Sequence, residues 1–267
     1  MKDYLLELVS KQEGLNAKMN IMREYLQAYI LRIMHNGGVF RSTAFVGGTA
    51  LRFLYGLPRF SEDLDFSVIR QDAADLSALV KKIDEELALA GYEAAVTYTG
   101  KKAVRSAFVK FPGLMYEAGI SPLRGQNISV KIEIDVNPPA GAAVKTMIVN
   151  KYFPVAFLSY DIPSLFAGKI HALLSRRYVK GRDFFDLGWY LSKWHNLTPN
   201  IVFLANALKQ TGWRRELPKE TTWVNLVYKA VREADWQKVK RDVENFLENP
   251  KDADIFTKEN VLRLIKP

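Results

Sequence analysis

The sequence predicts an α+β fold with two domains, a mixed-sheet domain over residues 1–160 and a helical domain over residues 161–267. Short apolar runs with the two-residue alternation of strands are concentrated before residue 160. After that point nearly every segment shows the apolar spacing of helices. We expect the helical domain to close a cleft over the sheet domain, and the functional site to lie in that cleft.

The amino-acid composition excludes several classes of protein. The chain has 267 residues, 48% of them hydrophobic, and its 38 Lys and Arg exceed its 29 Asp and Glu by nine. This excludes a disordered or fibrous protein. Because there is no cysteine, disulfides, thiolate zinc sites and cysteine nucleophiles are excluded too. The positive charge favours a polyanionic partner, since cations that neutralise phosphates release condensed counterions.

No targeting or membrane segment is expected. Residues 1–7 carry acidic side chains where a signal peptide would need an apolar region. The most apolar stretches, 25–34 and 155–168, are interrupted by charged residues and fall short of the roughly 20 apolar residues that a membrane span requires. The sequence therefore predicts a cytoplasmic protein with no membrane contact.

The elements of the first domain follow from apolar periodicity and from Gly and Pro punctuation. Residues 1–36 are helical in their spacing and stop at Gly37 and Gly38. The further predictions, in order, are a strand at 44–48 that runs into a glycine turn, a helix at 49–55, a strand at 64–68, a helix at 73–90 capped by Asp72, and strands at 93–99, 105–111, 128–136, 146–149 and 155–158.

The second domain is predicted to be helical throughout, because its apolar residues recur at three- and four-residue intervals. The expected helices are 163–178, 182–194, 199–208, 221–246 and 258–265.

Two aspartates in the 64–68 strand region carry the first chemical signal. Residues two apart on a strand share a face, so Asp63 and Asp65 lie on one side about 7 Å apart along the backbone, with Leu64 and Phe66 turned into the core. Two carboxylates on one face repel, and the pKa of at least one must rise unless a cation lies between them. Mg²⁺ is the best counter-charge, because it takes one or two carboxylates together with waters and substrate phosphates. A lone Asp-x-Asp is more often a solvated loop.

A glycine turn lies shortly before these aspartates. Gly47, Gly48 and Thr49 supply unobstructed backbone N–H groups, a hydroxyl and a helix N-terminus, which together favour phosphate. Taken alone, Gly-Gly-Thr is more often an ordinary strand-to-helix turn. Its combination with aspartates embedded in an apolar strand favours a functional site.

A third carboxylate is needed if two metal ions are to be held. The strand 128–136 supplies one, because its alternation puts Lys131, Glu133 and Asp135 on one face. The alternative is a half-exposed strand with its charges in water. We prefer Asp135 to Glu133 as the metal ligand, because Asp135 lies nearer the end of the strand, where clefts open.

Together these segments resemble a known family. The series runs from Gly47-Gly48-Thr49 through Arg59-x-Ser61-x-Asp63-Leu64-Asp65-Phe66, Lys131-x-Glu133-x-Asp135 and Lys169 to Arg182-Asp183-x-x-Asp186-Leu187. It is similar to the AbiEii/MenT group of toxin-like nucleotidyltransferases in the polymerase-β-like superfamily. The resemblance implies a polymerase-β-like nucleotidyltransferase domain that transfers a nucleoside monophosphate from an NTP and releases pyrophosphate.

The resemblance also implies roles for residues of the first domain. Asp63 and Asp65 would bind the two Mg²⁺ ions, and Asp135 would complete the site and help to activate the acceptor hydroxyl. Gly47, Gly48 and Thr49 would grip the outer phosphates, with Lys131 as a further nucleotide-binding candidate. Ser61 would contact phosphate or be phosphorylated in regulation, two alternatives between which the sequence does not choose.

Three residues of the second domain join this set. Lys169 shares a helix face with apolar residues and either extends along them or, as the resemblance implies, pairs with the triphosphate. Asp183 and Asp186 are one helical turn apart. Asp183 is a nucleotide-binding candidate, although it can also complement the helix dipole or pair with Arg176 or Arg177. We expect Asp186 to orient Lys169 or the nucleotide.

The acceptor is the least determined part. Basic residues lie beside aromatic ones in the C-terminal region, as in Lys193-Trp194 and Trp213-Arg214-Arg215, and such pairs can clamp RNA and stack an unpaired 3′ end. The plainer interpretation is a helical core with solvated charges. The resemblance implies a toxin that modifies RNA, with a tRNA 3′ end as acceptor and a cognate antitoxin as partner. The alternatives are a small-molecule acceptor or a non-catalytic, basic nucleic-acid-binding module.

Overall fold

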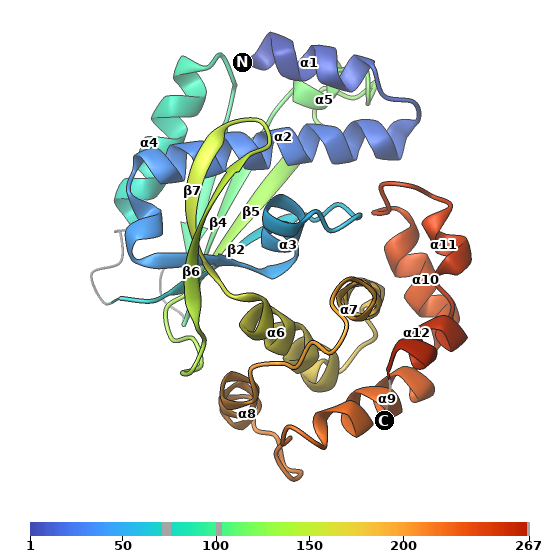
Figure 1. Cartoon of the computed structure of the whole chain (residues 1–267). Helices are drawn as coiled ribbons and strands as arrows, with labels where there is room; N and C mark the ends of the chain where they lie inside the picture. Colours follow the sequence, from blue (N-terminus) through green and yellow to red (C-terminus); the bar gives the residue numbers. More distant parts are fainter. Residues whose placement is uncertain (71–75, 100–102, 266–267) are drawn as a thin grey trace. The chain divides into compact units, whose positions relative to one another are not determined.

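The structure is a computed structural model that describes residues 1–70, 76–99 and 103–265 (Figure 1). The chain divides into two compact units. Unit 1 comprises Met1–Gly56, Phe60–Asn137 and Lys145–Ser159, and unit 2 comprises Leu57–Arg59, Pro138–Val144 and Tyr160–Pro267. Helices and a mixed sheet together confirm the predicted α+β class.

Unit 1 is built on a mixed sheet with the strand order β3-β4-β5-β2-β1-β7-β6. Strands β1 and β2 are antiparallel, β2 and β5 are parallel, and β4 is antiparallel to both β3 and β5. The strands are β1 (Thr43–Val46), β2 (Asp63–Val68), β3 (Ala95–Thr99), β4 (Val104–Phe111), β5 (Ile128–Asp135), β6 (Val144–Asn150) and β7 (Pro154–Tyr160).

The buried face of this sheet packs against the helices of unit 1, and α2 runs across the sheet in Figure 1. Phe45 of β1 stacks on Phe66 of β2 and Phe157 of β7 with ring centroids 5.3 and 5.2 Å apart, so the central strands share one aromatic layer. The helices are α1 (Lys2–Ser10), α2 (Leu15–Asn36), the 3₁₀ turn η1 (Val39–Arg41), α3 (Gly47–Tyr55), α4 (Leu76–Leu89) and α5 (Leu114–Glu117).

Two sequence predictions for unit 1 need correction. The helical stretch 1–36 is two helices, because Gly14 takes a left-handed backbone conformation with φ +80° just before α2. The glycine turn is itself helical, so α3 begins at Gly47 and not at Thr49. The predicted cap Asp72 and the predicted helix start at residue 73 lie outside the described residues.

Unit 2 is helical. Its helices are α6 (Ile162–Ser175), α7 (Gly181–Lys193), α8 (Ile201–Gln210), α9 (Trp223–Glu233), α10 (Trp236–Glu244), α11 (Asp252–Ile255) and α12 (Lys258–Leu264). The single helix predicted over 221–246 is therefore wrong. Ala234 has an extended backbone, and the Asp235 side chain accepts a hydrogen bond from the Lys238 N–H and caps α10.

A close backbone approach joins α7 to α10. A Cβ at Gly181 would collide with the backbone carbonyl of Val239, so only glycine fits at the start of α7. Arg182 then places its guanidinium 4.1 Å from the ring centroid of Phe246, with Nε 3.8 Å from Asp242 Oδ2. In the described part of the chain, no helix has the length and apolar character needed to cross a membrane.

Candidate functional site

The predicted site residues are divided between the two units. Unit 1 contains Gly47, Gly48, Thr49, Ser61, Asp63, Asp65, Lys131 and Asp135, and unit 2 contains Lys169, Asp183 and Asp186.

Strand β2 presents its two aspartates as the alternation predicts. Asp63 and Asp65 are half-buried, whereas Leu64 and Phe66 between and after them are almost fully buried. The two carboxylates therefore lie on the face of β2 opposite the apolar core. This confirms the predicted strand and its inward and outward faces.

The neighbouring strand β5 lies beside β2 in a defined register. Asp63 is opposite Lys131, Asp65 is opposite Glu133, and Ser67 is opposite Asp135. Residues that are paired between adjacent strands point to the same face of the sheet. These three pairs therefore form consecutive rows on one face. The carboxylate in the row of Asp65 is thus Glu133, and Asp135 lies one row further along β5.

Lys131 and Glu133 interact on this face. Lys131 Nζ lies 2.7 Å from Glu133 Oε1. The hydrogen bond to Glu133 raises the pKa of Lys131 above its usual value, against the lowering effect of burial, and the charges of Asp63 and Asp65 add to the rise. Lys131 is therefore a protonated cation within electrostatic reach of both aspartates.

Asp135 has a different environment. Its Oδ1 accepts a hydrogen bond of 2.9 Å from the backbone N–H of Asn137, just past the end of β5. Burial raises the pKa of the Asp135 carboxyl, and this backbone hydrogen bond opposes the rise. Its predicted role as a metal ligand stays a prediction.

The glycine turn touches the second aspartate. Gly47 has φ +77°, and a Cβ added there would overlap the Asp65 carboxylate. Two features therefore require glycine at this position: the left-handed backbone conformation and the close approach of the carboxylate. The sequence motif placed the turn and the aspartates near each other, and the structure brings them into contact.

The hydroxyl of Thr49, which the resemblance implies would grip phosphate, makes a hydrogen bond within the protein, and its role at a phosphate stays a prediction. The side chain is fully buried, and Oγ1 donates a 2.5 Å hydrogen bond to the backbone carbonyl of Asp63. Thr49 therefore ties α3 to the first residue of β2. Gly48 is buried as well, which leaves Gly47 as the half-buried residue of the turn.

A second set of contacts from α2 holds this region in place. Glu24 pairs with Arg52 of α3 and also accepts from Lys151 Nζ at 2.9 Å. One turn later, Gln27 Nε2 donates to the carbonyls of Ser61 and Glu62 at 3.0 and 2.9 Å. Helix α2 therefore contacts both α3, which begins at the glycine turn, and the residues that precede Asp63. Nothing in the sequence pattern indicated a role for Gln27.

The donor set on this face fits Mg²⁺ in part. Asp63 and Asp65 offer hard oxygen ligands. The carboxylate of Asp65 fits where it is because Gly47 has no Cβ to collide with it. Within 1–70, 76–99 and 103–265, no three His, Asp or Glu side chains gather into a group that could hold a metal ion. Two carboxylates suit an ion that completes its shell with waters and substrate phosphates.

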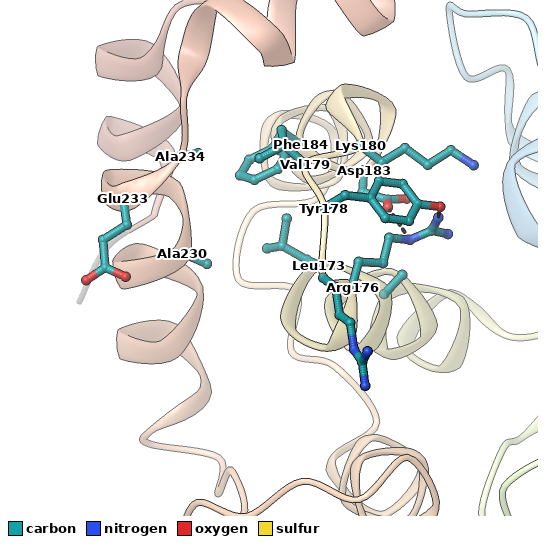
Figure 2. A pocket seen from close by; sticks show the side chains of 12 residues that line it. Leu173, Arg176, Tyr178, Val179, Lys180, Asp183, Phe184, Ala230, Glu233 and Ala234 are labelled. Atoms are coloured by element: carbon teal, nitrogen blue, oxygen red, sulfur yellow. Dashed lines mark hydrogen bonds and ion pairs between the residues drawn. The ribbon is translucent and has the colours of Figure 1, made fainter.

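In unit 2 a buried carboxylate lies at the start of α7. Asp183 is 3% exposed, and Arg176 Nε lies 3.0 Å from its Oδ2 (Figure 2). Arg176 also donates from Nη1 to the Tyr178 hydroxyl at 3.2 Å. Of the alternatives open for Asp183, the structure thus contains the ion pair with Arg176.

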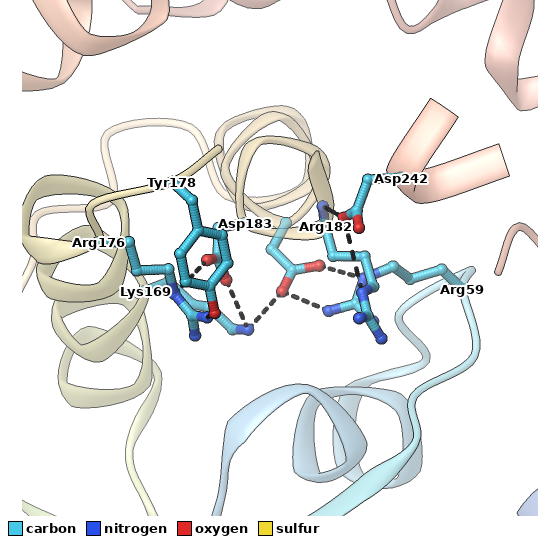
Figure 3. Close-up of polar contacts among 8 residues, drawn as sticks. Arg59, Lys169, Arg176, Tyr178, Arg182, Asp183 and Asp242 are labelled. Atoms are coloured by element: carbon cyan, nitrogen blue, oxygen red, sulfur yellow. Dashed lines mark hydrogen bonds and ion pairs between the residues drawn. The ribbon is translucent and has the colours of Figure 1, made fainter. Parts of the chain in front are cut away.

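One turn further, Asp186 is fully buried between two cations. Arg59 donates to it through Nε at 2.6 Å and Nη2 at 2.7 Å, and Lys169 Nζ lies 2.7 Å from Oδ2 (Figure 3). Burial alone raises the pKa of Asp186, but Arg59 and Lys169 outweigh it and hold that pKa below its usual value. Lys169 is 15% exposed and also lies 3.5 Å from Asp183 Oδ1.

Arg59 is the contributor that the sequence did not assign. It is 2% exposed and reaches Asp186 across 127 positions of sequence. Its backbone forms an isolated bridge with Leu247, and the Glu248 N–H donates to the carbonyl of Pro58. The motif Arg59-x-Ser61-x-Asp63 was the only signal, and it did not indicate a partner.

Comparison with solved structures finds similar proteins, and the first of them shares the fold. The chain superposes on a protein of H. pylori described provisionally as a nucleotidyltransferase, with a TM-score of 0.52, 17% identity and 92% of each chain covered. JHP933 from Helicobacter pylori matches with a TM-score of 0.48 and 16% identity, over 91% of this chain and 87% of that one. No curated protein matches the sequence significantly.

The family follows from the sequence profile together with the site. Residues 30–258 match the model described as nucleotidyl transferase AbiEii toxin, type IV toxin–antitoxin system. The matched range covers most of the chain and contains the glycine turn, both aspartates of β2 and the Lys169–Asp186 pair. This chain belongs to the AbiEii family of nucleotidyl transferase toxins.

Proposed function

We propose that this protein transfers a nucleoside monophosphate from an NTP to the 3′ end of an RNA, with tRNA as the acceptor. The acceptor hydroxyl oxygen attacks the α-phosphorus of the NTP and forms a phosphodiester bond. The bond between the α-phosphorus and the bridging oxygen breaks, and pyrophosphate leaves. Modification of the acceptor stem's end would block translation, in keeping with a toxin that acts in the cytoplasm beside a cognate antitoxin.

One observation supports this proposal above the others. Asp63 and Asp65 share one face of β2, and the backbone of Gly47 at the start of α3 lies against the Asp65 carboxylate. Carboxylates that can take Mg²⁺ are thus adjacent to a helix start whose N–H groups suit phosphate. A nucleotide triphosphate carries both of the groups that this arrangement would bind.

Each residue of the proposed site in unit 1 has its own role in the reaction. Asp63 and Asp65 hold Mg²⁺, Gly47 and Gly48 bind the outer phosphates through backbone N–H groups, and Lys131 adds a positive charge beside them. Asp135 completes the site and helps to take the proton from the acceptor hydroxyl. The ion, when bound, neutralises charge on the transferring phosphoryl group.

Unit 2 contributes through Lys169. In the family resemblance this lysine meets the triphosphate, and its ammonium here lies against Asp186 and Asp183. We propose that these two aspartates position the ammonium, so that it offers a fixed point charge to the nucleotide.

The test is transfer of label from each α-labelled NTP to total RNA in the presence of Mg²⁺, followed by gel separation. Wild-type protein should label a tRNA-sized band, and Asp63→Asn should remove nearly all of that label. Asp84→Asn is the matched control, because Asp84 is an exposed residue of α4 and undergoes the same chemical change. The melting temperature of each variant should equal that of the wild type.

The outcomes separate the parts of the proposal. Full labelling by Asp63→Asn would overturn the assignment of the site. Label that appears only in small products, and never in RNA, would overturn the RNA acceptor while leaving nucleotidyl transfer intact. Label in RNA that is larger than tRNA would overturn tRNA as the acceptor.

A further inference from the structure

Two pockets of unit 2 adjoin each other. One has a volume of about 220 Å³ and the other about 330 Å³, and they share Leu173, Ala230 and Glu233. In Figure 2, Ala230 of α9 and Ala234, which follows that helix, face Leu173 and Phe184 across the first pocket. The two pockets form one groove along α6 and α9, and we call it the α6–α9 groove.

The α6–α9 groove is rich in positive charge. Its cations outnumber its anions, Asp183 and Glu233, and Asp183 already faces Arg176 and Lys169. The cations that line the groove are Arg176, Arg177, Lys180, Arg214, Arg215 and Lys229. Such a surface attracts a polyanion, and each phosphate it neutralises releases counterions.

Three of these cations have little or no internal counter-charge, since the charge of Asp183 acts on Lys180 without a direct ion pair. Among the described residues, Lys180, Arg177 and Arg214 make no ion pair. Burial, together with the charges of Arg182 and Arg176, lowers the pKa of Lys180 below its usual value. An external anion at this position would relieve the repulsion among the cations.

Aromatic rings are interleaved with the charges. The Arg176 guanidinium lies 5.9 Å from the ring centroid of Tyr178, and that of Arg215 lies 5.5 Å from the ring centroid of Trp213. Tyr178 is 66% exposed, so its ring is accessible to a ligand. One arginine–aromatic pair therefore lies in each of the two pockets.

We propose that the α6–α9 groove binds single-stranded RNA, with phosphates on its cations and unpaired bases stacked on Tyr178 and Trp213. Phosphate contacts and base stacking on exposed aromatic rings are the two interactions that single-stranded nucleic acid uses, and every base can stack on such a ring. The choice of RNA rests on the proposed function, because the acceptor's unpaired 3′ end must reach the enzyme.

The experiment measures RNA binding directly, without NTP or Mg²⁺. A fluorescent single-stranded RNA of about a dozen nucleotides, within the range that such sites cover, is titrated with the full-length protein at several salt concentrations. The test variant is Arg177→Gln with Arg214→Gln, one exposed cation from each pocket. The matched control is Arg241→Gln with Lys251→Gln, two exposed cations of unit 2 that line neither pocket.

We expect the test variant to bind about tenfold more weakly at low salt, where phosphate contacts dominate affinity. The slope of log K against log salt should fall by about 1.4, since each phosphate contact on a single strand contributes about 0.7. The control variant should match wild type in both quantities. Equal affinity of wild type and test variant, or an equal loss in the control, would overturn the inference.

Stacking is tested at Tyr178. Tyr178→Ala should weaken RNA binding several-fold at every salt concentration, and Tyr178→Phe should restore it, because the ring and not the hydroxyl does the stacking. If Tyr178→Ala binds as wild type and polyglutamate competes as well as RNA, the groove attracts any polyanion and the inference for RNA is overturned.

The result is independent of the proposed reaction. If RNA binding depends on the groove but the protein transfers no label, the inference about the groove is supported and the proposed reaction is overturned. Labelling of RNA by a test variant whose RNA affinity is unchanged would do the reverse.

Discussion

The two pairs of aspartates in this molecule have the same chemistry and opposite surroundings. Asp63 and Asp65 are half-buried on the outer face of β2, beside a glycine turn that leaves space for a carboxylate. Asp183 and Asp186 are at most 3% exposed and lie against Lys169, Arg59 and Arg176. Burial therefore separates the half-buried carboxylates of β2 from the carboxylates of α7, which the fold encloses together with cations.

This difference indicates which pair an external ligand can use. A buried carboxylate that already accepts from two cations has few lone pairs left for a metal ion or a phosphate-bound water. A half-buried carboxylate on a sheet surface keeps access to solvent and hence to a ligand. The proposed metal binding is therefore a role for the aspartates of unit 1, whereas Asp183 and Asp186 would position Lys169 and stabilise unit 2.

The sharpest way to break the comparison is to neutralise one residue of each pair. Asp186→Asn should lower the free energy of unfolding by about 3–5 kcal/mol, because it removes the buried carboxylate that pairs with Arg59 and leaves Lys169 with Asp183 alone. Asp65→Asn should leave unfolding nearly unchanged and reduce nucleotidyl transfer by about 10³-fold, the scale seen when charge stabilisation of a transferring phosphoryl group is lost. Urea unfolding and the labelling assay measure the two effects.

Asp242→Asn is the control for the first change. Its partner Arg182 is 3.8 Å away, and the Asp242 side chain is 34% exposed, so the loss should stay within about 1 kcal/mol. A destabilisation by Asp65→Asn as large as that by Asp186→Asn would abolish the distinction between the two pairs.

The glycine turn offers a second test. Gly47→Ala places a methyl group on the Asp65 carboxylate and demands a left-handed backbone from alanine, at a cost of about 1–3 kcal/mol. Transfer should fall further than stability alone explains, since Asp65 must move. Gly56→Ala is the control, because Gly56 has φ +72° with open space around it and reports backbone strain alone.

Thermal unfolding and transfer rates of both glycine variants separate the effect of backbone strain from the effect of the contact with Asp65. Similar transfer in Gly47→Ala and Gly56→Ala would show that the contact with Asp65 has no part in the reaction.

Acid should act on unit 2 through Asp186. Its folded pKa lies below the unfolded value of about 3.9, so the folded state binds fewer protons than the unfolded state when the pH falls through that range. The stability from this group is complete above the unfolded pKa and is lost as the pH falls through the folded pKa. Urea midpoints between neutral pH and pH 3 should therefore decline less steeply in Asp186→Asn than in the wild type, and equal slopes would contradict the assignment.

The smallest expected effect distinguishes the two acids of β5. Glu133→Gln should change transfer by less than about tenfold and stability by less than about 1 kcal/mol, because Glu133 pairs with Lys131 on a partly exposed surface. Asp135→Asn should reduce transfer by at least about 10²-fold, as expected for loss of a group that acts on the reacting atoms. The reverse order in the labelling assay would favour Glu133 over Asp135 as the acid of β5 that acts in the reaction.

Some features of the molecule followed from the sequence alone. The alternation in β2 and β5 fixed which residues face inward, because a strand's side chains point to opposite sides at every step. The glycines, the two aspartates and the series ending at Asp186 identified the family whose model covers residues 30–258. These are local patterns, and local geometry is what short stretches of sequence encode.

Tertiary structure decided the rest. Register between β2 and β5 placed Glu133 beside Asp65, although the strand pattern of 128–136 is the same whichever row it pairs with. Folding brought Arg59 to Asp186 and turned the Thr49 hydroxyl to the carbonyl of Asp63. Such contacts depend on where distant segments meet and on how buried they become, and no spacing within one segment specifies either quantity.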